Sequence, residues 1–346
     1  MTLIARLMEN LSLSLQEYQR LIEGRTPEIA DILAEQAVMV RKKIYGNAVY
    51  VRGLIEISNY CKNDCFYCGI RRSNRHCARY RLSPDQILLC AKEGYRLGFR
   101  TFVLQGGEDA FFTDGVLYEL IRTLKKNHPD CAVTLSLGER GRESFRILRE
   151  AGADRYLLRH ETADRAHYQT LHPPEMSYEH RMQCLRDLRE LGYQVGCGFM
   201  VGSPGQTSAA LAQDLKWIEE FKPDMCGIGP FIPHRETPFR AEPPGTVELT
   251  CYLLSIIRLI HPPVLLPSTT ALGTIAPQGR EQGILAGANV VMPNLSPESV
   301  RKKYELYDNK LCTGVESAQC RERLEVQMRS IGYEIVTERG DIKKIK

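Results

Sequence analysis

Residues 58–69 have the sequence SNYCKNDCFYCG and directly follow the strand-like run Val51 to Ile57. Three thiols, those of Cys61, Cys65 and Cys68, are separated by three and then two residues in this stretch. Three close thiolates on one loop can bind three irons of a cubane iron–sulfur cluster, and the fourth iron then stays open to a small molecule. The spacing therefore predicts a reactive, incompletely ligated cluster at the end of a strand.

A structural zinc site is the alternative for the same loop. Paired thiols also suit tetrahedral zinc, with His76 or Cys77 as a fourth ligand. Zinc ribbons usually carry a second CxxC-type pair, and the sequence has none. Spacing and position favour the cluster.

The composition is that of an ordinary globular protein. The chain has 346 residues, of which 43% are hydrophobic and 25% charged, and its net charge is +4 with basic residues scattered along it. We expect neither nucleic acid nor a membrane as a partner, because there is no basic tail and no apolar run of membrane-spanning length. The N-terminus lacks the features of a signal peptide, which predicts a cytoplasmic protein.

Most of the other cysteines stand alone within apolar runs. Such thiols are typical of small buried side chains in a reducing compartment and not of a disulfide framework. The cysteines in question are Cys90, Cys131, Cys184, Cys197, Cys226 and Cys251.

From residue 49 to residue 310 the chain alternates short apolar runs with longer amphipathic ones. This rhythm predicts βα units and a parallel sheet. Eight such units favour a single (βα)8 barrel of the TIM type over a flat doubly wound sheet, which stays open as the alternative. The eight expected strands are Val51–Ile57, Thr101–Gln105, Ala132–Leu137, Arg155–Arg159, Val195–Val201, Met225–Gly229, Val264–Ser268 and Asn289–Met292.

Two extensions flank the predicted barrel. Residues 1–48 have helix-period apolar positions, with Ser14 and Thr26 as helix starts. Residues 311–346 form a short C-terminal extension.

Strand parity predicts a polar lumen. Alternate residues of a barrel strand face inward, which places Arg155 and Arg159 of one strand and Thr134 of another on the inner side. Buried guanidinium groups are costly unless an anion or several acceptors meet them. We therefore expect a ligand-filled barrel with an anionic or strongly hydrogen-bonding substrate. The alternative is that these arginines pair with internal carboxylates such as that of Glu161, or reach solvent.

The cysteine loop after a first strand resembles that of the radical S-adenosylmethionine (SAM) enzymes. That resemblance implies a 4Fe-4S cluster whose open iron is chelated by SAM, and cleavage of SAM to a 5′-deoxyadenosyl radical. It also places Tyr67 near the adenine.

Several longer stretches resemble the HydE family of FeFe-hydrogenase maturases, over nearly the whole chain. They are Tyr60–Gly69, Leu104–Asp109, Thr134–Glu139, Ala153–Thr162, Gly227–His234, Thr269–Ala271 and Met292–Asn294. The resemblance implies assembly of the hydrogenase H-cluster, with attack on a sulfur atom of an iron-bound cysteine substrate. It also implies other hydrogenase maturation proteins as partners.

The resemblance suggests roles for individual residues. Gly107 and Glu108 resemble the segment that meets the methionyl amino group, Glu161 suits the ribose hydroxyls, and Arg181 suits the methionyl carboxylate, with Ser136 touching the same cofactor. Without the resemblance, Arg181 would be a surface ion pair and Glu161 a helix-start carboxylate. For the substrate we name Gln105, Thr134, Arg155, Arg159, Thr269, Thr270, Met292, Tyr304 and Tyr307. We assign neither His160 nor His234 as a catalytic base.

The C-terminal extension departs from the family pattern. Some maturases carry an auxiliary cluster on three cysteines, whereas this chain has Cys312 and Cys320 with Arg323 at the third position. Two thiols and an arginine make a poor cluster site, so we expect a degenerate or vacant one.

Two other functions compete with this interpretation. Another radical SAM enzyme, of the methylornithine synthase or biotin synthase group, would share the barrel and the cysteine loop. A noncatalytic iron–sulfur carrier would also explain the cysteines, but not the SAM-contact residues.

Overall fold

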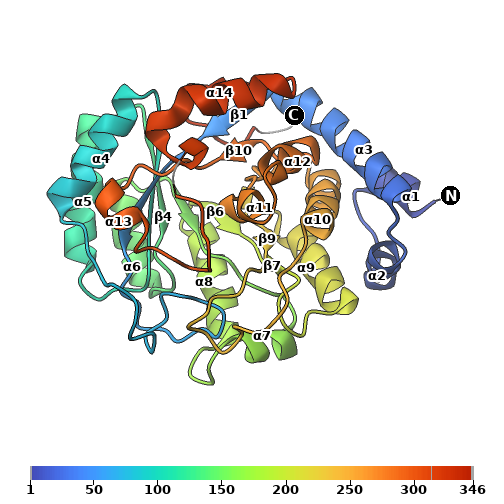
Figure 1. Cartoon of the computed structure of the whole chain (residues 1–346), viewed down its shortest axis with the longest axis horizontal. Coiled ribbons are helices and arrows are strands. Elements are labelled where there is room, and N and C mark those ends of the chain that lie inside the picture. The colour runs from blue at the N-terminus through green and yellow to red at the C-terminus, as the bar shows by residue number, and fades with distance from the viewer. Residues whose placement is uncertain (1, 313, 344–346) are drawn as a thin grey trace.

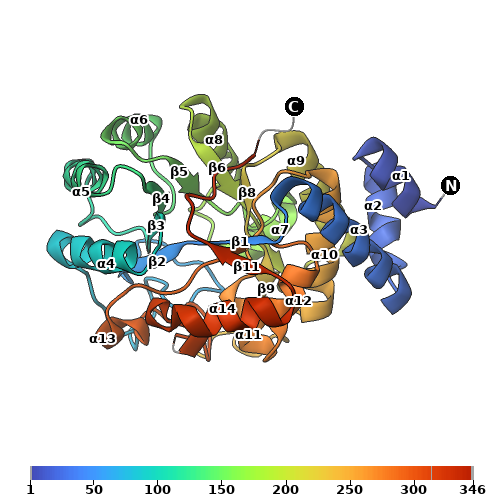
Figure 2. The same cartoon turned by 90° about the horizontal axis from the view of Figure 1, so that it is seen from above.

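The computed structural model describes residues 2–312 and 314–343 as alternating strands and helices. Figure 2 shows helices α4, α5, α6, α8 and α9 as an outer arc around the strands, with α1, α2 and α3 lying beyond α10. The strands are β1 (Ala48–Val51), β2 (Gly53–Ser58), β3 (Thr101–Gly106), β4 (Ala132–Ser136), β5 (Arg155–Leu157), β6 (Gln194–Cys197), β7 (Met200–Val201), β8 (Met225–Cys226), β9 (Gly229–Pro230), β10 (Val290–Val291) and β11 (Glu334–Val336).

The helices vary from one to five turns, and Figure 1 labels them along the chain. They are α1 (Leu3–Asn10), α2 (Leu15–Glu23), α3 (Pro27–Tyr45), α4 (Pro84–Arg96), α5 (Asp114–Asn127), α6 (Arg142–Ala151), α7 (Arg165–Leu171), α8 (Tyr178–Glu190), α9 (Ser208–Phe221), α10 (Val247–Ile260), α11 (Thr270–Ile275), α12 (Gly279–Leu285), α13 (Glu298–Arg301) and α14 (Arg321–Ser330). Two 3-10 turns, Gly314–Glu316 and Ala318–Cys320, precede α14.

The central sheet has the order β2-β3-β4-β5-β6-β8, and every pairing in it is parallel. Parallel bridges continue beyond β8, from Met225 to Leu265 and from Pro267 to Val290. Strand β10 then pairs with β1, which runs on into β2. The predicted α/β fold with a parallel sheet is confirmed.

The strand predictions have the right order, but the predicted strand Val264–Ser268 is reduced to isolated bridges at Leu265 and Pro267, and the bounds of the others differ from the structure. The first predicted strand starts at Ala48 and is interrupted at Arg52. The fifth and sixth each break into two short pieces, β6 with β7 and β8 with β9. At the first of these breaks Gly198 has φ +149°, and a Cβ there would lie 2.0 Å from the Gly227 carbonyl oxygen. The breaks therefore come from close backbone approach, which hydrophobic periodicity does not reveal.

The expected helical N-terminal segment is present, with both predicted starts. Ser14 forms a capping box with Glu17, and Thr26 accepts a hydrogen bond from the Ile29 amide just before Pro27 opens α3. Helix α3 packs on α10 and α2 on α9, where the Tyr18 hydroxyl donates to Glu219 over 2.7 Å. These helices therefore add an outer layer to one side of the helical arc.

The C-terminal tail covers the N-terminal ends of the strands, which the sequence did not predict. Strand β11 pairs in parallel with β1, and the tail beyond it crosses the strands in Figure 2. Thr101, the first residue of β3, donates to the Arg339 carbonyl oxygen over 2.7 Å. Arg155, the first residue of β5, donates to the same oxygen over 2.8 Å and to the Asp341 carboxylate over 2.5 Å. The end of the sheet opposite the cysteine loop is thus closed by the chain itself.

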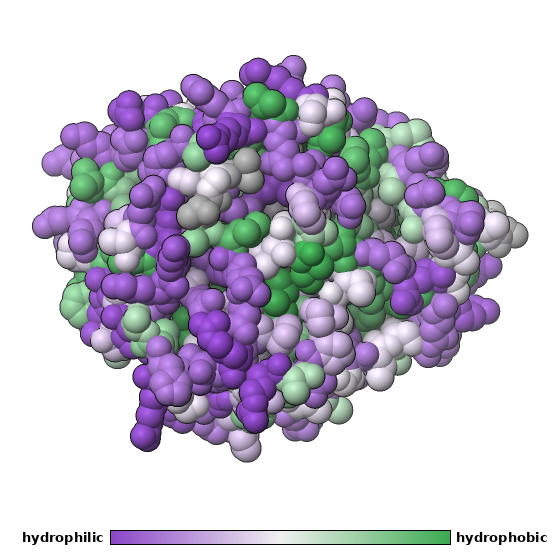
Figure 3. Space-filling view, in the orientation of Figure 1, coloured by the Kyte–Doolittle hydropathy of each residue, from purple (hydrophilic) through white to green (hydrophobic). Residues whose placement is uncertain are grey.

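The apolar core lies between the sheet and its helices. Five of the six lone cysteines are buried and Cys251 is half-buried, and all twelve cysteines of the chain are free thiols. In Figure 3 the visible face is mostly hydrophilic, with apolar side chains gathered near its middle. Among the described residues no helix combines the length and the apolar character needed to span a membrane.

Candidate active site

The loop that carries the three cysteines follows β2 and is fixed by buried side chains. The Asn59 amide donates to the Ala78 and Lys303 carbonyl oxygens over 3.0 and 2.7 Å. Asp64 accepts from the Arg71 Nε at 2.8 Å and from the Ser73 amide at 3.0 Å, and these bonds hold the pKa of its carboxyl below the ordinary value. These hydrogen bonds therefore define the shape of the loop.

Cys61, Cys65 and Cys68 all line one cavity of about 330 Å³. Burial raises the pKa of each thiol, that of Cys65 to about 12, and the neighbouring thiols raise the pKa of Cys68 further. Such thiols stay protonated on their own, and a metal that takes their protons makes them ligands. Three free thiols that line one cavity fit the predicted cluster.

The residues of the zinc alternative lie elsewhere. The His76 side chain is 78% exposed and its Nδ1 lies 2.8 Å from Glu236. The Cys77 sulfur accepts from the Asn59 amide at 3.5 Å, and neither residue lines the cavity. The loop and these two residues do not form one four-ligand site in the structure.

The cavity brings together most of the residues that the sequence predicted. All of the residues predicted to contact SAM line it: Tyr67, Gly107, Glu108, Ser136, Glu161 and Arg181. The predicted substrate residues that line it are Gln105, Arg159, Thr269, Thr270, Met292, Tyr304 and Tyr307.

Arg155 and Thr134 do not line this cavity. Arg155 is fully buried, but its guanidinium binds the tail, Thr101 and Gln194, so the prediction that it faces the substrate is wrong. Its partner is an internal carboxylate, as the alternative interpretation required, although the carboxylate belongs to Asp341. The Thr134 hydroxyl is buried without a hydrogen-bond partner among the described residues.

Gly107 sits where the chain after β3 meets the cysteine loop. A Cβ at this position would lie 2.2 Å from the Tyr60 carbonyl oxygen and 2.7 Å from the Cys61 Cβ, so only glycine fits. Next to it, Glu108 accepts from the Glu139 amide over 2.9 Å and lies 3.0 Å from the Lys62 Nζ. The carboxylate is thereby held at the cavity wall.

Glu161 and Arg159 approach each other at the end of β5. Glu161 has φ +67°, an uncommon conformation for a non-glycine residue, and its Oε2 lies 3.1 Å from the Arg159 guanidinium without hydrogen-bond geometry. The Arg159 side chain is 34% exposed, and its Nε has no partner among the described residues. The pair thus keeps polar atoms free for a ligand.

Arg181 reaches the cavity from α8 and is held by two partners. Its guanidinium donates to the Glu139 carboxylate and, over 2.7 Å, to the Arg159 carbonyl oxygen. It is buried, so it is not the surface ion pair that its helix position alone suggested.

The two threonines after the seventh predicted strand differ in their hydrogen bonding. The Thr270 hydroxyl donates to Glu316 over 2.9 Å, whereas the Thr269 hydroxyl is buried without a partner among the described residues. Only the Thr269 hydroxyl therefore has its proton free for a ligand.

Tyr304, Leu306 and Tyr307 belong to one segment that lines the cavity. The Tyr304 hydroxyl accepts from the Gln105 amide at 3.4 Å. The Gly69 amide, next to the last cluster cysteine, donates to the Leu306 carbonyl oxygen over 2.8 Å. The segment is thus joined to the cysteine loop.

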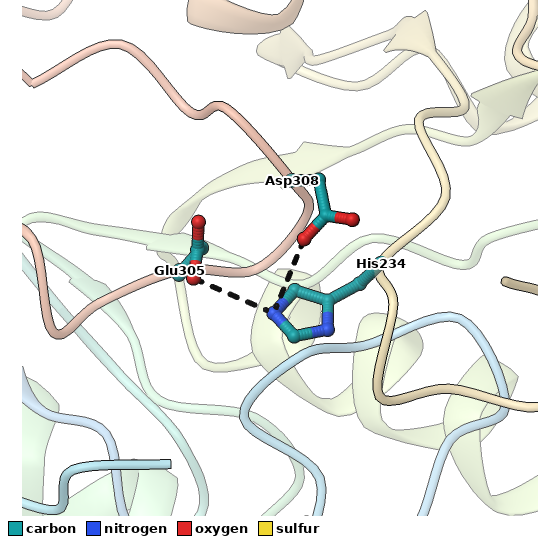
Figure 4. A group of neighbouring side chains, drawn as sticks. All are labelled: His234, Glu305 and Asp308. Atoms are coloured by element: carbon teal, nitrogen blue, oxygen red, sulfur yellow. Dashed lines mark ion pairs between the residues drawn. The ribbon is translucent and has the colours of Figure 1, made fainter. Parts of the chain in front are cut away.

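His234, Glu305 and Asp308 form the group drawn in Figure 4. The His234 Nε2 lies 3.7 Å from Glu305 and 3.9 Å from Asp308, and Arg235 binds both carboxylates. The His234 Nδ1 accepts from the Glu236 amide at 3.1 Å, so the neutral ring carries its proton on Nε2, toward the carboxylates. This protonation state opposes metal binding. The group instead links the segment that contains Glu305 and Asp308 to the loop after β9.

His160 is likewise structural. Its Nδ1 accepts from the Gly198 amide and its Nε2 lies 3.2 Å from Asp214, with both side chains fully buried. It does not line the cavity.

Sequence reasoning missed two charged residues of the cavity wall. Glu56 on β2 accepts from the Lys310 Nζ over 2.6 Å and from the Asn294 amide over 2.8 Å. A lone carboxylate within the apolar run of β2 was the available sign of Glu56. No sequence pattern pointed to Lys310, because it lies in a segment without helix or strand periodicity.

Three comparisons relate the chain to known proteins. Residues 55–218 match the family described as the Radical SAM superfamily. The FeFe hydrogenase maturase subunit HydE of Thermotoga maritima is 44% identical over 290 residues, which cover 84% of this chain and 82% of that protein.

Less similar relatives share the same architecture. The 3-methylornithine synthase of Methanosarcina acetivorans is 28% identical over 88% of this chain and 86% of its own length. The crystal structure of methylornithine synthase PylB superposes with a TM-score of 0.84, at 25% identity and 97% coverage of both chains. With its higher identity to the maturase, this chain belongs to the HydE family of FeFe-hydrogenase maturases, which are radical SAM enzymes that use a 4Fe-4S cluster and SAM.

Proposed function

We propose that this enzyme attacks a sulfur atom of an iron-bound cysteine substrate during assembly of the hydrogenase H-cluster. The observation that carries the proposal is a single cavity that contains both the three cluster thiols and several polar side chains suited to an anionic ligand. Buried polar atoms without partners are rare in folded proteins and need a ligand or water to satisfy them. Arg159 and Thr269 contribute such atoms to the cavity wall.

For SAM we assign contacts that the cavity supports. Gly107 lets the backbone approach closely, and Glu108 beside it offers a carboxylate to the methionyl amino group. Arg181 offers the donors for the methionyl carboxylate, and Glu161 accepts from the ribose hydroxyls. Tyr67 lies beside the adenine and Ser136 beside the same cofactor in this proposal.

For the substrate we assign the remaining polar residues of the cavity. Arg159 and Thr269 donate to its anionic groups, and Gln105 orients it together with Tyr304. Thr270 has its proton committed to Glu316, so it acts as an acceptor. Met292 and Tyr307 complete the wall, and Arg155 is left out because the tail already satisfies it.

When bound, the cluster and SAM supply a 5′-deoxyadenosyl radical. The chain's own residues hold the substrate sulfur within its reach and keep water away from it. Tyr304, Leu306 and Tyr307 serve the second purpose, because they cover the cavity and are tied to the cysteine loop through Gly69.

We also propose that the parallel pairings close a (βα)8 barrel over residues 49–310. The bridges at Leu265 and Val290 and the pairing of Leu54 with Asn294 support this closure. Residues 1–48 and 311–346 are then extensions. We place the enzyme in the cytoplasm with the other hydrogenase maturation proteins as partners, because its twelve free cysteines suit a reducing compartment.

The test is anaerobic reconstitution with iron and sulfide, reduction with dithionite, and EPR spectra with and without SAM. We expect a cluster signal that shifts with SAM, formation of 5′-deoxyadenosine, and an iron content of about four per chain, since Cys312 and Cys320 lack a third thiol. Cys65→Ala should lose the signal and the product, whereas Cys251→Ala, on α10, should keep both.

Other outcomes would assign the chain differently. Tightly bound zinc would return the cysteine loop to a structural role. A cluster whose EPR signal does not change on addition of SAM would indicate a noncatalytic iron–sulfur carrier. A methylornithine-type or biotin-type product would indicate one of the related synthases.

A further inference from the structure

We propose that Lys310 determines substrate specificity by binding a carboxylate of the substrate, and that Glu56 holds the lysine in place. The inference rests on the proposed function, because it names the part of the cysteine substrate that this corner of the cavity recognises. Both side chains line the cavity that contains the cluster thiols.

The pair is buried in the cavity wall. The Glu56 side chain is fully buried and that of Lys310 is 8% exposed, and their charged atoms lie 2.6 Å apart. The free energy needed to desolvate two charges usually exceeds the free energy gained from their attraction. A buried ion pair is therefore weak evidence for a contribution to stability. Its place in the wall of a ligand cavity gives the pair a role in binding.

The two partners differ in how fully they are satisfied. One oxygen of Glu56 accepts from Lys310 and the other from the Asn294 amide. An ammonium group has three donors, and Glu56 is the one hydrogen-bond partner of the Lys310 Nζ within residues 2–312 and 314–343. Glu56 thus fixes the lysine, and the lysine keeps donors for a ligand.

The position of Lys310 matches the substrate end of the cavity. Its Nζ lies 5.3 Å from the centroid of the Tyr304 ring, and the Tyr304 hydroxyl contacts Gln105. Both neighbours are residues that we assign to the substrate. An ammonium group at this place, with donors left over after its bond to Glu56, complements the carboxylate of an amino acid.

The backbone that carries Lys310 is held in place. The preceding turn is tied to Arg235 through Glu305 and Asp308, over 2.9 and 2.7 Å, and lies against His234 (Figure 4). Leu306 accepts from the Gly69 amide. A lysine presented from a fixed segment pays less entropy on binding than a free surface lysine.

The test compares two thioether probes that cannot act as thiolate ligands. S-methyl-L-cysteine keeps the carboxylate, and 2-(methylthio)ethylamine lacks it. Calorimetry on the reconstituted enzyme with SAM should show tighter binding of the amino acid, by about tenfold for one charged hydrogen bond. Lys310→Met should remove this preference and Lys310→Arg should retain part of it.

Lys310→Met leaves Glu56 buried without its cation, and this variant is at risk of misfolding. The double variant Glu56→Gln with Lys310→Met keeps the site neutral, and thermal unfolding and iron content report whether it is folded. Lys302→Met, an exposed lysine of the same region, controls for loss of charge.

The outcomes separate this inference from the proposed function. A folded double variant that still prefers the carboxylate, or a wild-type enzyme that binds neither probe or both equally, would overturn the role of Lys310. Absence of SAM cleavage by the wild type would instead overturn the proposed function.

Discussion

At the scale of single residues, the site depends on contacts that tolerate no added atoms. Gly107 is the sharpest case, since a Cβ there would overlap the Tyr60 carbonyl oxygen and the Cys61 Cβ. These atoms belong to the backbone and to a proposed cluster ligand, so neither can move without moving the cysteine loop. Only glycine therefore fits beside the proposed metal site.

We predict that Gly107→Ala impairs the cluster while the chain stays folded. The loop must shift to accept the methyl group, which displaces Cys61 from its partners. Iron and sulfide per chain should fall by at least about twofold after reconstitution, as expected when one ligand is misplaced. Gly115→Ala is the matched control, because its Cβ meets no atom within 4 Å. Equal iron content in both variants would contradict the prediction.

At the scale of elements, the two arginines of β5 and its C-terminal end have different surroundings. Arg155 at its start is bound to the tail, whereas Arg159 just beyond its end lines the cavity. Strand parity placed Arg155 and Arg159 on the same side of this strand. It had no information about the tail, because the pairing of β11 with β1 joins residues far apart in sequence. Polar residues in the cavity wall could thus be predicted, and the partner of each charge could not.

The same limit explains the other differences between sequence and structure. That Cys61, Cys65 and Cys68 lie together could be predicted, because the three residues are close in the sequence. Glu56 and Lys310 were missed because their contact spans a large part of the chain, and no local pattern encodes it. Strand breaks such as that at Gly198 also come from tertiary packing.

We predict that Arg155→Met destabilises the fold and releases the tail. Removing one partner of a buried ion pair costs about 3 kcal/mol, at the low end of the usual range because the Asp341 carboxylate is 39% exposed. Thermal unfolding should occur at lower temperature, and limited proteolysis should cleave the tail sooner. Arg159→Met should change unfolding by less than about 1 kcal/mol, since its ion pair is partly solvated. Equal destabilisation by both would refute this division.

At the scale of the whole molecule, imidazoles shielded from water contribute to the dependence of stability on pH. Burial lowers the pKa of His172 to about 3 and that of His261 to about 4, against an ordinary value of 6.5. The unfolded chain therefore binds protons between pH 6.5 and 4 that the folded chain excludes. The stability that these residues provide is complete above pH 6.5 and is lost as the pH falls toward their folded values.

Each such imidazole should make the free energy of unfolding fall by about 1.4 kcal/mol per pH unit in that window. We predict that His261→Gln, outside the cavity lining, reduces the slope by that amount, because glutamine does not titrate. Urea unfolding at several pH values from 7 to 5, with matched iron content, measures the difference. Carboxyl groups with a lowered pKa, such as that of Asp341, lose their contribution to stability only when the pH falls below the ordinary carboxyl pKa. They therefore do not affect the slope between pH 7 and pH 5. If the free energy of unfolding had the same pH dependence in wild type and variant, His261 would be protonated as readily in the folded protein as in the unfolded chain, and the prediction would be wrong.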